Sequence, residues 1–162
     1  MELPEPIAGA VKPLLQHLPL DRAMPELTPK HAAPFNVLKM VEQIIQDHPE
    51  VGGSPPLCAG LWLYVDDLDR SHAISQGIET PTGWFWHAIM HRREGDFSNS
   101  HYWYRRVGWH PAMDALPEYN GHEFVDEVEA HHVQNPEPLV GRQRLEWAAL
   151  FTWCAREISS EL

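Results

Sequence analysis

The feature that most constrains the fold is a segment that occurs twice, at an offset of 29 residues. Residues 67–72 (DLDRSH) align with residues 96–101 (DFSNSH). Each copy follows an aromatic-rich stretch, at residues 60–65 and 84–90, and leads into another short helical stretch. A helix, a tight turn and a second helix are therefore expected twice. The aspartate that opens each copy can cap the second helix through its carboxylate.

The second copy carries a pattern of residue types found in a known repeat family. Residues 93–97 (REGDF) are followed by Ser100, Tyr104 and Pro111. This order resembles the Gly-Asp-aromatic turn, small residue, aromatic residue and terminal proline of a tetratricopeptide repeat. The first copy departs from the pattern at Asp66, which replaces the turn glycine, and both units are shorter than the roughly 34 residues of that family. The resemblance implies helical hairpins that form a binding scaffold.

A longer stretch, residues 86–106, also resembles a group of uncharacterised microbial proteins that share a WHAIMHRREGD-type segment. In this chain the segment runs from Trp86 to Asp96. No activity is attached to that group, so this resemblance implies no mechanism.

Helical periodicity continues on both sides of the repeated segments. One stripe precedes them, formed by Val37, Met40, Val41, Ile44 and Ile45. Residues 121–129 continue as a helix, and the last helix starts at Asn135-Pro136. Its apolar stripe consists of Trp147, Leu150, Phe151, Cys154 and Ile158. We therefore predict an all-α fold, a compact bundle of about six helices with two tetratricopeptide-like hairpins at its centre.

Proline separates an N-terminal arm from the rest of the chain. Ten of the fifteen prolines precede residue 57, and in residues 1–34 only the stretch 7–18 offers a helix, interrupted at Pro13. We predict a proline-rich arm over residues 1–34, laid over a single helical domain that comprises residues 35–162. Cys58 and Cys154 have no metal or redox spacing and are expected to be small core residues.

Charge and hydropathy exclude several classes of partner. The formal charge of −11 repels phosphate backbones, so we expect no nucleic-acid partner. No apolar run approaches the roughly 18 residues of a membrane span, and the first residues do not resemble a signal peptide. We therefore expect a cytoplasmic protein without a membrane partner. The sequence does not indicate an oligomeric state.

The first candidate site is a stripe of metal-ligand side chains on one helix. His87, His91 and Glu94 fall within about 60° of one another in a helical projection. Two imidazoles and a carboxylate at this spacing suit a divalent metal such as zinc. Further ligands would come from elsewhere, with these candidates: His72, His101, Asp66 and His131. The structural alternative is that the stripe is a solvated helix face.

The second candidate site is a group of arginine and aromatic residues, unusual in an acidic chain. Its members are Arg92, Arg93, Tyr102, Trp103, Arg105 and Arg106. Arginine forks match carboxylates and phosphates, and aromatic faces stack on planar groups. A small anionic ligand or a peptide would fit such a surface.

The alternative for two of these arginines is an internal ion pair. Arg92 and Arg93 lie towards the apolar side of their helix, where a charge needs an acidic partner. The partners considered are Asp66, Asp67, Asp69 and Asp96.

Two functions follow from the two candidate sites. The first is a helical module that binds a ligand or partner through the arginine and aromatic residues. The second is a metal-dependent, hydrolase-like enzyme with His87 and His91 as ligands and Glu94 as a ligand or general base. A purely structural role for the charged residues is the third possibility.

Overall fold

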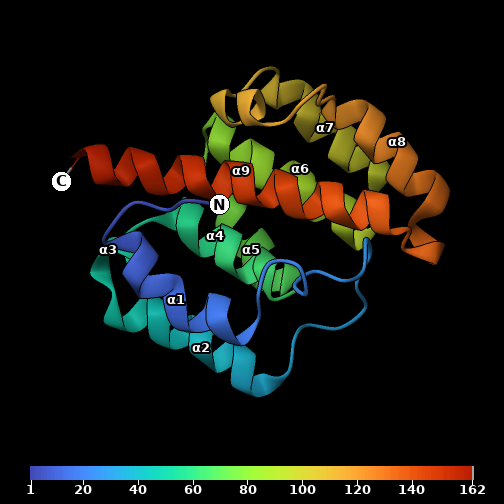
Figure 1. Ribbon diagram of the computed structural model, residues 1–162. Coiled ribbons are helices and arrows are strands. Elements are labelled where there is room, and N and C mark those ends of the chain that lie inside the picture. Colours follow the sequence, from blue (N-terminus) through green and yellow to red (C-terminus); the bar gives the residue numbers. More distant parts are fainter. Residues whose placement is uncertain (162) are drawn as a thin grey trace.

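The computed structural model describes residues 1–161, and all regular structure in this range is helical (Figure 1). The predicted all-α class is confirmed, but the described residues form nine α-helices, so the expected number of about six was too low. The helix that the sequence did not indicate is α3, a single turn that starts at Pro49. Proline is well tolerated in a first helical turn, where its missing N–H group would have no partner.

The helices follow one another along the chain with short connections after residue 48. Their bounds are α1 (Ile7–His17), α2 (Phe35–Asp47), α3 (Pro49–Gly52), α4 (Pro55–Tyr64), α5 (Leu68–Ser75), α6 (Pro81–Glu94), α7 (Phe97–Val107), α8 (Gly121–His131) and α9 (Glu137–Glu161). Two 3₁₀-helices, η1 (Pro111–Ala115) and η2 (His132–Gln134), flank α8. None of the helices in the described residues is both long and apolar enough to cross a membrane.

The repeated segments form two helix pairs, α4–α5 and α6–α7, here called the first and second hairpin. The expected caps are present, because the Asp67 carboxylate accepts the Arg70 N–H at 3.1 Å and the Asp96 carboxylate accepts the Asn99 N–H at 3.2 Å. Each hairpin therefore starts its second helix in the same way.

A buried serine ties the two helices of each hairpin together at the same relative position. Ser71 donates its hydroxyl to the Ala59 carbonyl oxygen at 2.9 Å, and Ser100 donates to the Ala88 carbonyl oxygen at 2.7 Å. Both serines are fully buried. The two hairpins, 29 residues apart, therefore share this hydrogen bond as well as the residue types of the repeated segment.

The tight turn of each hairpin needs one residue in the left-handed region. Gly95 has φ of +85°, and Asp66, at the equivalent position, has φ of +59°. Glycine adopts this conformation without steric cost, and aspartate is among the residues that tolerate it. The replacement of glycine by Asp66 therefore leaves the turn geometry intact.

The long helix α9 crosses α4 and α6 and closes the core (Figure 1). Four residues of its predicted stripe, Trp147, Leu150, Phe151 and Cys154, are buried, and Ile158 is half-buried. The approach to α4 depends on Gly60, because a Cβ atom there would lie 2.8 Å from the Trp86 ring and 2.9 Å from the Phe151 ring.

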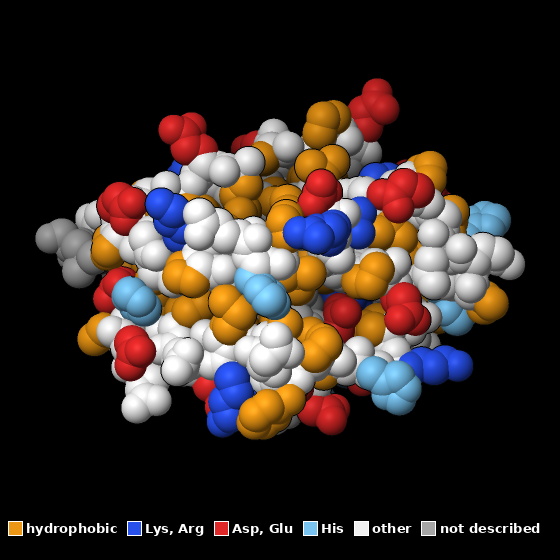
Figure 2. All heavy atoms as spheres, turned by 60° about the horizontal axis from the view of Figure 1, so that its bottom comes forward, with side chains coloured by type: hydrophobic (Ala, Val, Ile, Leu, Met, Phe, Trp, Pro, Cys, Tyr) orange, Lys and Arg blue, Asp and Glu red, His pale blue; other side chains and the backbone are white. Residues whose placement is uncertain are grey.

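The N-terminal arm contributes to the core through α1. Ile7, Ala10, Val11 and Leu14 are buried, and α1 packs against α2 and α3. The predicted interruption at Pro13 is wrong, because α1 continues through it. Pro13 has no N–H group, so the Gly9 carbonyl oxygen lacks its helical hydrogen bond. Gly9 is exposed, and water can bind this oxygen. On the face that carries α1 and α2, apolar, acidic and basic side chains are mixed, and there is no broad basic area (Figure 2).

Candidate metal centre

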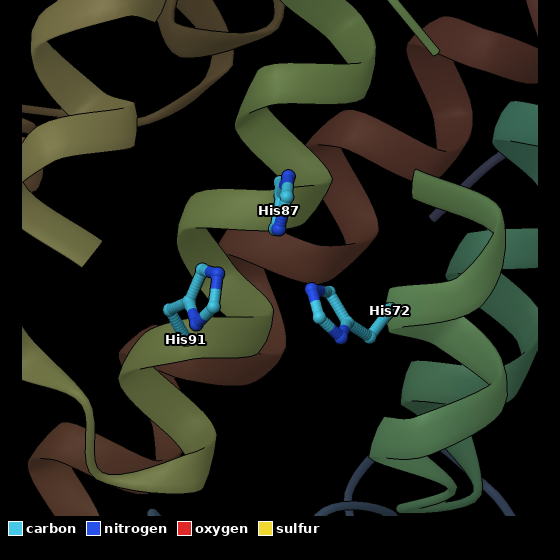
Figure 3. A group of neighbouring side chains, drawn as sticks. All are labelled: His72, His87 and His91. Atoms are coloured by element: carbon cyan, nitrogen blue, oxygen red, sulfur yellow. The ribbon is translucent and has the colours of Figure 1, made fainter. Parts of the chain in front are cut away.

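Three histidines from the two hairpins meet between α5 and α6. His72 belongs to α5, and His87 and His91 belong to α6 (Figure 3). Their ring centroids are 4.9 Å apart for His72 and His87, 5.2 Å for His72 and His91, and 4.6 Å for His87 and His91. Each ring offers a nitrogen, and these nitrogens lie within 4.8 Å of one another. We call this group the three-histidine cluster.

Local structure explains why these side chains meet. His87 and His91 are four residues apart on α6 and therefore share one helix face. The start of α6 is fixed by Thr80, whose hydroxyl accepts the Gly83 N–H at 3.3 Å. His72 follows the buried Ser71, and α5 packs against α6, so that His72 lies opposite the other two rings.

The cluster is shielded from water. His87 is 4% exposed and His91 is 5% exposed, so the alternative of a solvated helix face is wrong for these two residues. Both ring nitrogens of His87 are buried and have no hydrogen-bond partner in the described residues. An unsatisfied buried polar group typically costs about 1–3 kcal/mol, and nearly all such groups in proteins have a partner. His87 therefore lies in an environment that an additional ligand would complete.

Burial also sets the protonation state of His87. Desolvation, followed by repulsion from His91 and His72, lowers the pKa of His87 to about 3. The ring is therefore neutral at neutral pH, and the neutral imidazole is the form that binds metal ions.

Glu94 lies beside the cluster rather than within it. The Nδ1 atom of His91 is 2.6 Å from a carboxylate oxygen of Glu94. A carboxylate at this position fixes the ring and its tautomer, leaving Nε2 of His91 for a metal ion. The ligand atoms of Glu94, Asp96 and His91 also lie within 4.8 Å of one another, but both carboxylates are exposed. The expected triad of His87, His91 and Glu94 is thus replaced by three histidines with Glu94 behind one of them.

The other candidate ligands lie elsewhere. His101 contacts His122 of α8, with 2.8 Å between their Nδ1 atoms, and its Nε2 is 2.9 Å from Asp126. Asp66 pairs with Arg93, and His131 is exposed at the end of α8. Of the further candidates, only His72 joins the cluster.

An aromatic side chain covers the outer side of the cluster. The half-buried Trp103 stacks on His87 at 4.1 Å between centroids, with 22° between the planes. The Arg106 guanidinium lies 5.4 Å from the Trp103 ring and 4.7 Å from the Trp84 ring. Tyr102 is 44% exposed and accepts a hydrogen bond from Arg106 at 3.3 Å.

Arg92 is an internal residue. Its guanidinium is fully buried and forms a bidentate pair with the Glu146 carboxylate, at 3.0 and 2.6 Å. The hydroxyl groups of Tyr104 and Tyr119 also donate to Glu146. The Arg92 guanidinium lies over the Phe124 ring, 4.3 Å from its centroid.

Arg93 is internal as well. It donates to the Leu63 carbonyl at 2.8 Å, to the Glu26 carbonyl at 3.2 Å and to the Asp66 carboxylate at 2.5 Å. The ion-pair alternative therefore describes both arginines, with Asp66 as one expected partner and Glu146 as an unexpected one. Arg92 and Arg93 do not share a surface with Arg105 and Arg106, which are exposed on α7.

Glu146 is the main residue of this interior that sequence reasoning missed. It lies four residues before Leu150 and three after Gln143, and all three side chains are buried on α9. Its helical spacing from the apolar stripe was therefore a usable signal. Its partner, however, is 54 residues away in the sequence.

Comparison with protein-family models, with curated proteins and with solved structures finds no match to this chain.

Proposed function

We propose that this protein binds one divalent metal ion of the zinc class through His72, His87 and His91. The observation that carries the proposal is the buried His87 ring, whose two nitrogens have no partner in the described residues and which faces two other imidazoles. Zinc–nitrogen bonds of about 2.1 Å place tetrahedral ligands roughly 3.4 Å apart. The 4.8 Å limit on the nitrogen separations thus requires only small side-chain movements.

Three protein ligands leave a fourth coordination position open, which is the pattern of catalytic rather than structural zinc. A zinc ion supplies a Lewis acid for hydrolysis at such a position. His72 is half-buried, so it forms the side of the cluster nearest to solvent. A metal-dependent, hydrolase-like activity is the reaction class that follows.

Glu94 has the role of a positioning residue in this proposal. Its bond to Nδ1 of His91 holds the ring, and loss of such a partner typically lowers metal affinity about 10–100-fold. Glu94→Gln keeps the shape of the side chain but removes its charge, so it should weaken metal binding without abolishing it.

The test is elemental analysis of protein purified without a histidine tag. Wild type should hold one metal per chain, and His72→Ala, His87→Ala and His91→Ala should each lose it. His101→Ala is the matched control, since His101 occupies the position of His72 in the second hairpin but lies outside the cluster. Metal-free wild type after growth with zinc, or equal metal content in all four variants, would rule the centre out.

A second candidate is a ligand-binding scaffold, favoured by the exposed side of α7. Arg105 and Arg106 have no acidic partner among the described residues, although the chain has a charge of −11. Tyr102 and Trp103 lie on the same helix. Together with hairpins of tetratricopeptide-like type, these residues suit a small anion or an acidic peptide. Titration with a fluorescent acidic peptide tests it, and Arg105→Ala/Arg106→Ala should abolish binding.

A further inference from the structure

A hollow of ≈ 420 Å³ lies where the end of α7 meets η1 and the start of α8. It is lined by Tyr104, Arg105, Gly108, Trp109, Met113, Tyr119, Asn120, Gly121 and His122. None of these residues belongs to the three-histidine cluster. The hollow is therefore separate from the cluster and lies between the end of the second hairpin and the start of α8.

The charge of this hollow is opposite to that of the molecule. The chain has 23 acidic residues, yet no carboxylate is among the residues that line it. Arg105 is exposed there and forms no ion pair or side-chain hydrogen bond within the described part of the chain. The Glu146 carboxylate beneath Tyr104 and Tyr119 is already paired with Arg92. An anion in the hollow would thus meet a free guanidinium, and the Asp114 carboxylate that adjoins the lining accepts the Trp109 indole N–H at 3.3 Å.

His122 adds a hydrogen-bonding group beside Arg105. Desolvation, followed by the charges of His101 and Arg105, lowers the pKa of His122, so the ring is mainly neutral at neutral pH. Its Nδ1 atom lies 2.8 Å from Nδ1 of His101, whose Nε2 donates to Asp126, so the neutral His122 ring donates through Nδ1 and offers Nε2 to a ligand as an acceptor. The first N–H groups of α8 are already bonded to the Asn120 side chain. The charge of an anion is therefore recognised by Arg105 and not by the helix end, and His122 accepts a hydrogen bond from a hydroxyl or amino group of the ligand.

Two aromatic rings complete the lining. Trp109 is 65% exposed, which is unusual for the largest apolar side chain, and its indole N–H is held by Asp114 at 3.3 Å. Tyr119 is half-buried, with its hydroxyl turned inward to Glu146. These rings offer faces on which a planar group can stack. The volume of the hollow suits one small molecule rather than a peptide.

We propose that this hollow binds a small aromatic anion, with the negative group on Arg105 and the planar group against Trp109. The ligand class is an aromatic compound that carries a phosphate or a carboxylate. The proposal shares Arg105 with the second candidate function but uses none of Tyr102, Trp103 and Arg106, and it is independent of the metal centre. Because Arg105 and Trp109 are exposed, their substitution leaves the core unchanged.

The experiment is isothermal titration with four probes. Adenosine 5′-monophosphate and 4-hydroxybenzoate carry both a ring and an anion, whereas adenosine lacks the charge and inorganic phosphate lacks the ring. We expect at least one of the first two to bind wild type, and adenosine and phosphate to bind at least about tenfold more weakly. A preference between the first two identifies the anionic group.

Arg105→Ala should weaken that binding at least about tenfold, and Trp109→Ala should weaken it as well. Arg106→Ala distinguishes this hollow from the outer α7 surface of the second candidate function, because Arg106 lies over Trp84 and Trp103, outside the hollow. Arg22→Ala is the control, because Arg22 is also an exposed arginine but lies between α1 and α2 and does not line the hollow. Equal losses in Arg105→Ala and Arg106→Ala would place the ligand on the general α7 surface and overturn the proposal. Binding of phosphate alone, or of no probe at millimolar concentration, would also overturn it.

Discussion

The two hairpins share a scaffold but differ in chemistry. Both have the capping aspartate, the left-handed turn residue and the buried serine at equivalent positions. At an offset of 29 residues, however, His87 and His91 of the second hairpin correspond to Cys58 and Trp62 of the first. Trp103, which stacks on His87, corresponds to Ile74.

The first-hairpin residues line a hollow of their own, between α2 and the first hairpin. Cys58, Trp62 and Ile74 lie there with residues of α2, and the hollow is mainly apolar. Burial raises the pKa of the Cys58 thiol to about 11, so the thiol is neutral and unreactive at neutral pH. The same backbone positions thus give an apolar surface in one hairpin and a polar cluster in the other. The residues that fold each hairpin are therefore different from the residues that give it its chemistry.

The largest expected effect comes from giving the second hairpin a residue of the first. Arg92→Leu introduces the residue found at Leu63, the equivalent position, and leaves Glu146 buried without its cation. Breaking a buried pair from one side typically costs about 3–5 kcal/mol. Urea denaturation measures the loss. The double variant Arg92→Leu/Glu146→Leu should recover part of the stability, and a loss below about 1 kcal/mol in the single variant would show that the pair is dispensable.

The next prediction is that a residue of the second hairpin, His87, makes the stability of the protein sensitive to acid. Because the pKa of His87 is about 3 in the folded protein and near 6.5 when unfolded, the unfolded chain takes up this proton first. The stability of metal-free protein should therefore fall as pH decreases from about 6.5 towards 3, by up to about 1.4 kcal/mol per pH unit from this residue. His110, with a pKa lowered by desolvation to about 4, acts in the same direction.

His87→Leu should flatten this dependence without loss of stability at neutral pH, since it removes two unsatisfied nitrogens. Chemical denaturation at several pH values after chelator treatment measures it. An unchanged slope in His87→Leu would mean that another group controls acid sensitivity.

A smaller effect tests whether the scaffolds are equivalent. Ser71→Ala and Ser100→Ala each remove one buried hydroxyl bond to a carbonyl, worth about 1 kcal/mol. The two losses should agree within about 0.5 kcal/mol, the usual tolerance for independent sites. Thermal denaturation of the two variants side by side provides the comparison. A much larger loss for one serine would show that the shared contact has different weights in the two hairpins.

The smallest effect concerns the turn. Gly95→Ala places a Cβ atom in open space but at φ of +85°. The substitution therefore causes no clash, and the backbone strain that it introduces should lower the stability by about 1 kcal/mol. Gly141→Ala is the matched control, because it also meets nothing within 4 Å but lies inside α9. That change should stabilise the protein by about 0.5–1 kcal/mol. Equal effects of the two substitutions would argue against turn strain.

Local patterns predicted much of the fold. The 3.6-residue periodicity placed α2, α8 and α9, and the capping aspartates placed the starts of α5 and α7. Both depend on residues close together in the sequence, so a single chain reveals them. The buried state of Cys58 and Cys154 was also confirmed.

Tertiary contacts set the limit of prediction at the candidate site. The helical projection brought His87 and His91 together, but it equally included Glu94, because a projection does not show which neighbours pack on a face. The choice of His72 over His101 depends on which helix each ring faces: α6 for His72 and α8 for His101. Likewise, the acidic partner required by Arg92 was expected, while its identity as Glu146 was not.

The position of His72 has a consequence for how such a site can originate. His72 comes from one copy of the hairpin and His87 and His91 from the next, so neither copy alone holds the set. If the copies arose by duplication, the cluster is a property of the seam between them and had no ancestor in the single unit. The contact between α7 and α8, which lies outside the two copies, also brings two histidines together, His101 and His122. In the case of duplication, the cluster arose where the two copies adjoin, while each copy kept the capping aspartate and buried serine that fold it.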